Sequence, residues 1–154
     1  MVQNSTRNRS GRICRLEIKT NKGFLPIEIK GPLSGGEISI DASASSQFVS
    51  ALLLAAPRMD QGLTVKNIGP SLPSAPHIEM TVAMLRERGI KVDNSEPNVW
   101  KVSPGEIFAV KSIIEPDLSN AAPFMVAAMI AGGSVTILDW PTKTTQPGDQ
   151  LRGI

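Results

Sequence analysis

The sequence contains one cysteine, one histidine and no tyrosine among its 154 residues. A single cysteine excludes a disulfide within the chain, and one histidine excludes a metal site built from several histidines. A Ser-His-Asp triad would have to use His77. The apolar runs are too short to span a bilayer, and polar residues follow Met1 in place of the apolar segment of a signal peptide. These absences predict a cytoplasmic protein with no membrane segment and no metal site.

Neither positive nor negative residues are in large excess, because the net charge is only +2. With 41% hydrophobic and 19% charged residues, the composition indicates a globular chain of ordinary domain size. The local basic excess lies near the start, at Arg7, Arg9, Arg12, Arg15, Lys19 and Lys22. No aromatic residue stands between these charges to stack on bases, so we interpret residues 1–24 as a disordered leader and expect no nucleic-acid partner. The alternative, a nucleic-acid arm, predicts salt-sensitive duplex binding that disappears without residues 1–22.

The most informative motif is Ser45-Ser46-Gln47-Phe48, which stands directly before the apolar run 49–56. The first turn of a helix has unpaired N–H groups and the positive end of the helix dipole, which together favour an anion. One serine would suffice as an N-cap. Three small polar residues before an apolar helix therefore favour a site for a phosphate or a carboxylate.

The hydrophobic pattern predicts an alternation of strands and helices. Residues 25–30 and 37–41 alternate like half-buried strands, and a helix over 46–56 is expected to stop near Pro57. A second helix is expected over 76–88, with Pro76 in its first turn and Gly89 as its C-cap. Its buried positions are predicted to be Ile78, Val82 and Leu85, with Met84 beside them. The remaining strands are predicted at 63–68, 90–92 and 99–102.

The order strand, helix, strand, helix, strand, strand begins again after Lys111, at an offset of about 74 residues. The second copy predicts a strand over 114–117, a cap at Ser119-Asn120, a helix over 123–131 and a strand over 134–138. A further helix is expected to begin at Gly148. One complete unit and the beginning of another indicate a piece of a larger protein.

Three segments carry a specific resemblance to a known family. They are Ser45 to Leu53 (SSQFVSALL), Leu72 to Thr81 (LPSAPHIEMT) and Glu115 to Ala121 (EPDLSNA). In this order and spacing they resemble 5-enolpyruvylshikimate-3-phosphate synthase (3-phosphoshikimate 1-carboxyvinyltransferase). The resemblance covers about Leu25 to the C-terminus and leaves residues 1–24 unmatched. In the segment Pro-Ser-Ala-Pro-His it is strongest to actinobacterial enzymes.

The resemblance implies an α/β (α+β) fold of repeated βαβαββ units, the inside-out α/β barrel of enolpyruvyl transferases. The family moves the enolpyruvyl group of phosphoenolpyruvate to the 5-hydroxyl of shikimate 3-phosphate, on the way to aromatic amino acids, and needs no cofactor. Its active site lies between two globular domains. Residues 1–113 would then belong to the N-terminal domain and 114–154 would open the C-terminal one, with a hinge near 106–115.

By resemblance, Ser45 and Ser46 bind the 3-phosphate, and Ser74 closes on it from the neighbouring helix. Gln47 reaches the reacting end of the substrates. His77 stands where many members have a tyrosine against the shikimate ring. The family's Lys-Ser…Arg motif, its phosphoenolpyruvate-binding Gly-rich segment and Arg, and its catalytic Asp, Lys and Arg have no counterpart here. We therefore expect no catalytic residue in this chain and no turnover by it alone.

Other interpretations of these residues are open. Singly, each serine is an N-cap or turn residue, Gln47 is solvated and His77 is a surface histidine. The nearest enzymatic alternative is the related UDP-N-acetylglucosamine enolpyruvyl transferase, which shares the fold and the donor but against which the Ser-Ser-Gln-Phe string argues. A non-catalytic module that binds an anion tightly is an alternative of another class. Because the helices over 46–56 and 123–131 would keep open apolar faces, we further predict non-native dimerisation, which a clean monomer in light scattering would contradict.

Overall fold

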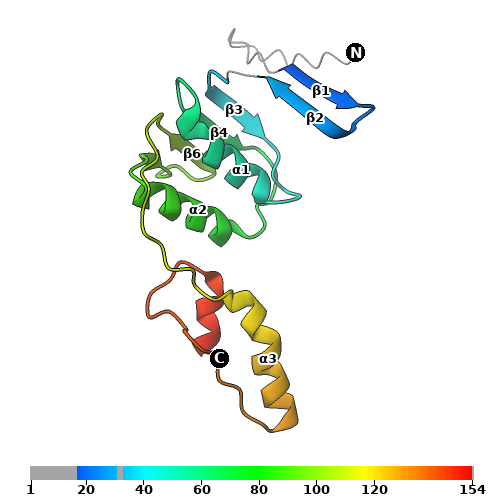
Figure 1. Cartoon of the computed structure of the whole chain (residues 1–154), viewed down its shortest axis with the longest axis vertical. Helices are drawn as coiled ribbons and strands as arrows, with labels where there is room; N and C mark the ends of the chain where they lie inside the picture. The colour runs from blue at the N-terminus through cyan, green and yellow to red at the C-terminus, as the bar shows by residue number, and fades with distance from the viewer. Residues whose placement is uncertain (1–16, 31–32, 154) are drawn as a thin grey trace.

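The computed structural model describes residues 17–30 and 33–153. Figure 1 shows a sheet-containing region above and two helical segments below, joined by residues 103–117, which have no regular secondary structure. No helix within the described ranges combines the length and apolar character needed to cross a membrane.

The sheet-containing region repeats the predicted element order. Strand β3 (Gly36–Ile40) pairs in parallel with β4 (Leu63–Asn67), and helix α1 (Gln47–Ala55) connects them. Helix α2 (Ala75–Glu87) follows, and then β5 (Val92–Asp93) and β6 (Val99–Val102) complete an open sheet in the order β3-β4-β6-β5. The predicted βαβαββ unit is therefore confirmed.

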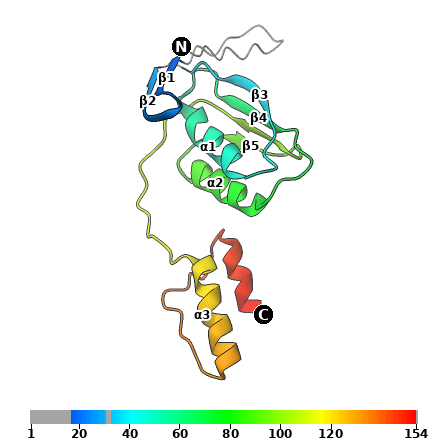
Figure 2. The ribbon, with the colours of Figure 1, turned by 90° about the vertical axis from the view of Figure 1, so that its right-hand side faces the viewer.

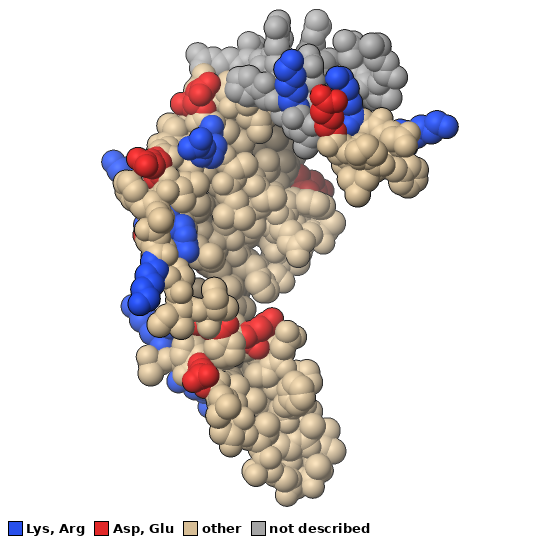
Figure 3. Space-filling view, viewed as in Figure 1, with Lys and Arg blue, Asp and Glu red and all other residues tan. Residues whose placement is uncertain are grey.

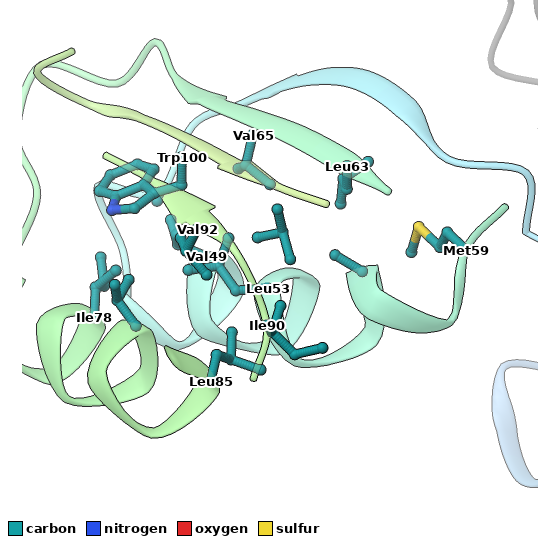
Figure 4. Close-up of a cluster of buried hydrophobic side chains, with 14 residues drawn as sticks. Val49, Leu53, Met59, Leu63, Val65, Ile78, Leu85, Ile90, Val92 and Trp100 are labelled. Atoms are coloured by element: carbon teal, nitrogen blue, oxygen red, sulfur yellow. The ribbon is translucent and has the colours of Figure 1, made fainter. Parts of the chain in front are cut away.

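Helices α1 and α2 cover one face of this sheet, and the hydrophobic core lies between the helices and the sheet (Figures 1 and 4). Val49 and Leu53 of α1 are one turn apart and fully buried, as the helical period requires. On α2 the predicted stripe of Ile78, Val82 and Leu85 is buried. Met84, expected beside that stripe, is half exposed because it lies about 100° around the helix from Leu85. The sheet contributes Leu63, Val65, Val92, Trp100 and Val102.

Both predicted ends of these helices are observed. The 3-10 turn η1 (Ala56–Arg58) contains Pro57 and ends the α1 segment. Gly89 takes φ +84° after α2, and the Ile90 N–H donates to the Leu85 carbonyl over 3.0 Å. This is the glycine-dependent C-cap that the sequence predicted. The Phe108 ring lies against Gly89, so the segment that follows β6 begins packed on the end of α2.

The predicted leader needs a correction in its last residues. Strand β1 (Glu17–Asn21) forms an antiparallel hairpin with β2 (Phe24–Lys30), the predicted strand over 25–30. Residues 17–24 are thus ordered by backbone pairing, which polar side chains do not prevent. Residues 1–16 lie outside the described residues.

The second copy differs more from its prediction. Helix α3 (Leu118–Ala131) begins before the predicted residue 123, and 114–117 and 134–138 form no strand. A strand is stabilised by its partner's ladder, and Figures 1 and 2 place these segments away from the described sheets. The predicted final helix is observed as the 3-10 helix η2 (Pro147–Gly153), which contacts α3.

Candidate functional site

The predicted residues Ser45, Ser46 and Gln47 lie at the N-terminal end of α1. The Gln47 N–H donates to the Ser45 hydroxyl oxygen over 3.2 Å, so Ser45 supplies the side-chain bond of this helix start. Ser46 occupies the N-cap position without a side-chain cap bond and is only 5% exposed. Gln47 is exposed. Because the first turn has no acidic residue, its N–H groups and dipole have no carboxylate to neutralise them.

Ser74 and His77 lie at the N-terminal end of α2, and both are exposed. Ser74 takes φ +52° and ψ +41°, a left-handed conformation that L residues other than glycine rarely adopt. Its hydroxyl makes no cap bond, while its carbonyl accepts from the His77 N–H over 2.9 Å. Such backbone strain is concentrated at functional sites, and here it occurs at a predicted phosphate ligand.

The loops before α1 and α2 pack directly against each other. The Asn67 carboxamide oxygen accepts from the Ala42 N–H over 3.0 Å and from the Gly69 N–H over 3.1 Å, so it joins both loops. A Cβ atom on Gly69 would lie 2.2 Å from Asp41 Oδ1, which only glycine permits. Both loops leave the C-terminal ends of the parallel strands β3 and β4, the edge at which open α/β sheets bind ligands.

Further along the two helices, Ser50, the fourth residue of α1, and Thr81, the seventh residue of α2, are 3.1 Å apart between their hydroxyl oxygens. Neither residue was assigned a role from the sequence, and neither was Asn67. A signal was present, because Ser50 and Thr81 interrupt otherwise apolar helix faces and Asn67 stands between a strand and Gly69. The structure thus brings the N-terminal ends that carry all five predicted residues side by side.

Asp41 is the acidic group in the loop before α1. The Ser43 hydroxyl and the Ser43 backbone N–H hold the pKa of the Asp41 carboxyl below its ordinary value. The backbone bond, 2.9 Å long, is the firmer cause, because the buried Ser43 hydroxyl oxygen has no partner of regular hydrogen-bond geometry. Asp41 is therefore ionised and holds its loop through Ser43.

The N-terminal end of α3 is arranged differently. The cap is Asp117, not the predicted Ser119-Asn120, because its carboxylate accepts the N–H groups of Ser119 (2.9 Å) and Asn120 (3.3 Å). The Leu118 N–H donates to Gln146 Oε1 over 3.0 Å. A carboxylate placed before two small polar residues competes better for these amides than their own hydroxyl and amide groups.

A groove on the described part of the chain lies away from the predicted site. A groove of about 630 Å³ lies at the opposite end of α2, lined by Arg86, Ile90, Lys91, Lys101 and four neighbours. None of the five predicted residues lines it, so we take the site from the helix N-termini and not from this groove. Within 17–30 and 33–153, no three His, Cys, Asp or Glu side chains come together as metal ligands.

Comparison with known proteins connects this arrangement to a family. The model of the EPSP synthase family (3-phosphoshikimate 1-carboxyvinyltransferase) matches residues 14–153, so the similarity begins before Leu25, where the motifs alone predict it to start. The solved structure of EPSP synthase from Acinetobacter baumannii is similar with a TM-score of 0.57 and 30% sequence identity. The match covers 76% of this chain and 26% of that enzyme, so the chain spans about a quarter of its length.

Proposed function

Because the chain belongs to the EPSP synthase family, we propose that it is part of a transferase that moves the enolpyruvyl group of phosphoenolpyruvate to the 5-hydroxyl of shikimate 3-phosphate and releases phosphate. Family membership is the observation that carries this proposal. Residues 1–113 belong to the N-terminal domain and 114–154 open the C-terminal domain. A cytoplasmic location is part of the same proposal.

The role of the chain is to hold part of the shikimate 3-phosphate. Ser45, Ser46 and Ser74 donate hydroxyl hydrogen bonds to the 3-phosphate, and the N-terminal ends of α1 and α2 add positive potential. Support comes from the adjacent helix starts and from the lack of acidic residues in either first turn. Gln47 reaches toward the reacting end, and His77 packs on the shikimate ring.

The chain by itself has no turnover under this proposal. Ser, Gln and His side chains at helix starts bind a phosphate, but enolpyruvyl transfer also needs cations that offset the charge of two phosphorylated substrates. The family's cationic motifs have no counterpart in this sequence. We expect no phosphate release from shikimate 3-phosphate and phosphoenolpyruvate, and measurable release would refute this part of the proposal.

The site is tested by titrating the chain with shikimate 3-phosphate in an NMR experiment. His77 is the only histidine, so its ring protons report on the α2 start without assignment of other histidines. We expect weak, saturable shifts of the His77 ring and of the Ser46 and Gln47 amides. The double variant Ser45→Ala/Ser46→Ala should weaken binding about 10-fold or more, because two charge-assisted hydrogen bonds are lost.

A matched control is Ser119→Ala, which changes the corresponding serine at the start of α3 and should leave the titration unchanged. UDP-N-acetylglucosamine is the control ligand for the related transferase and should cause no shift. Equal responses to both acceptors would contradict the assignment of the substrate. Tight binding of shikimate 3-phosphate would instead favour the non-catalytic anion-binding module.

Self-association of the isolated chain is a separate part of the proposal. The side chains of Phe124, Met129 and Ile130 on α3 are 64%, 71% and 82% exposed. In Figure 3 the lower part of the molecule is largely free of charged residues. Exposed apolar surface of this kind favours association, so we expect dimers in light scattering at high concentration.

A further inference from the structure

We propose that Ser50 and Thr81 are positioning residues that fix how the N-terminal ends of α1 and α2 lie relative to each other, and thereby set the affinity of the site for shikimate 3-phosphate. The inference rests on the proposed function for its ligand. Its structural part, the fixed relation of the two helices, concerns the free chain and can be tested without any ligand.

The direction of the hydrogen bonds follows from proton counting. Thr81 Oγ1 lies 3.1 Å from Ser50 Oγ and also 3.1 Å from the His77 carbonyl oxygen. A carbonyl oxygen only accepts, so the single hydroxyl proton of Thr81 goes to His77. Thr81 must then accept its second bond from the Ser50 hydroxyl. The resulting chain runs from Ser50 through Thr81 to the backbone of His77, a predicted substrate ligand.

The same chain reaches the α1 side of the site through the backbone. The Ser50 N–H donates to the Ser46 carbonyl over 3.1 Å, so Ser50 lies one turn below the buried N-cap serine. Thr81 lies one turn below His77. The pair therefore connects the fourth residue of α1 to the seventh residue of α2, near the N-terminal end of each helix.

The apolar contacts between these helices do not supply a directional link of this kind. Val49 and Leu53 of α1 and Ile78 and Val82 of α2 are buried, but the hydrophobic effect that drives their burial is non-directional. A hydrogen bond weakens steeply when its length or angle changes. The part-buried Ser50–Thr81 bond is the one side-chain hydrogen bond that the described residues place between α1 and α2. It therefore adds a directional restraint to the apolar packing between the two helices.

The first experiment measures shikimate 3-phosphate binding by the full chain, through the His77 ring shifts. Thr81→Val keeps the branched shape but loses both hydrogen bonds, and should weaken binding about 2- to 10-fold. Thr81→Ser keeps the hydroxyl and should restore the original affinity. Thr142→Val, at an exposed threonine in the α3 region, is the control and should bind normally. Unchanged affinity in Thr81→Val would overturn the role in binding while leaving the proposed function intact.

The second experiment uses the free chain. Residual dipolar couplings of the α1 and α2 amides give the relative orientation of the helices, which should change in Thr81→Val and in Ser50→Ala but not in Thr81→Ser. Because both substitutions break the same link, the double variant should change the orientation no further than either single variant. Identical couplings in wild type and Thr81→Val refute the inference even if the chain does not bind the substrate. Absence of wild-type binding together with altered couplings refutes only the proposed function.

Discussion

The N-terminal ends of α1 and α3 occupy corresponding positions in the two copies of the unit, yet their N-caps differ in charge and in hydrogen bonding. At α1 the N-cap serine makes no cap bond, and the first turn has no acidic residue. At α3 the Asp117 carboxylate and the Gln146 amide oxygen accept the first three N–H groups. A Cβ on Gly148 would also lie within 3.0 Å of the Ser119 nitrogen, so η2 packs on this end.

The difference teaches that one repeated supersecondary unit can begin its helix either with serines or with a carboxylate cap. An anion at α1 would meet hydroxyl groups and a dipole that no carboxylate compensates, whereas an anion at α3 would meet the charge of Asp117. The side chains of two or three residues, and not the helix itself, therefore set the charge at each helix start.

The largest expected effect is at the N-terminal end of α3. Gln146→Ala removes the acceptor of the Leu118 N–H and the donor bonds to Glu115 and the Pro116 carbonyl. Losing three bonds should destabilise the α3 region by roughly 2–4 kcal/mol. Native-state hydrogen exchange at the Leu118 amide measures this. Gln150→Ala, at an exposed glutamine of η2, is the matched control. Equal exchange in both variants would contradict the stabilisation of the α3 start by Gln146.

A smaller effect compares the two N-caps directly. Asp117→Ala should cost about 1 kcal/mol, the usual value of a lost N-cap. Ser46→Ala should cost less than about 0.5 kcal/mol, because the Ser46 side chain makes no cap bond. Hydrogen exchange within each helix reports the two costs separately. If Ser46→Ala destabilises α1 as much as Asp117→Ala destabilises α3, the two ends are alike and the comparison fails.

The smallest expected effect is a pH dependence at the N-terminal end of α3. The Thr144 hydroxyl, and next the Gln146 amide, hold the pKa of the Glu115 carboxyl below its ordinary value of 4.5. Trp140, and next Arg152, lower the pKa of Asp149 in the same region. A lowered folded-state pKa adds stability above the ordinary value, and that stability is lost as the pH falls through 4.5 and then through the folded-state pKa.

Hydrogen exchange around Leu118, measured from about pH 6 to about pH 3, should therefore show loosening at the acidic end. Glu115→Gln should reduce the pH-dependent change, and Glu106→Gln, at an exposed residue of the connecting segment, should leave it in place. A profile that Glu115→Gln does not alter would assign the acid sensitivity to other groups.

Much of the first unit could be predicted from the sequence because its signals are local. The strand over 99–102, the cap at Gly89 and the stripe Ile78, Val82 and Leu85 agree with the structure. The second unit was predicted less well. Residues 114–117 and 134–138 have strand-like sequences, but pairing partners decide whether such segments become strands. The cap of α3 was assigned to Ser119-Asn120, since spacing alone does not reveal which side chain reaches the amides.

The sequence by itself determined the element order of the unit, the five candidate site residues and the resemblance to the EPSP synthase family. These follow from residue types and short-range spacing, which the chain carries locally. Only the tertiary structure decided that Asn67 and Gly69 join the two loops, that Ser50 meets Thr81, and that Gln146 closes α3. Gln146 and Leu118 are far apart in sequence, and only folding brings a donor and an acceptor at such separation within hydrogen-bond distance.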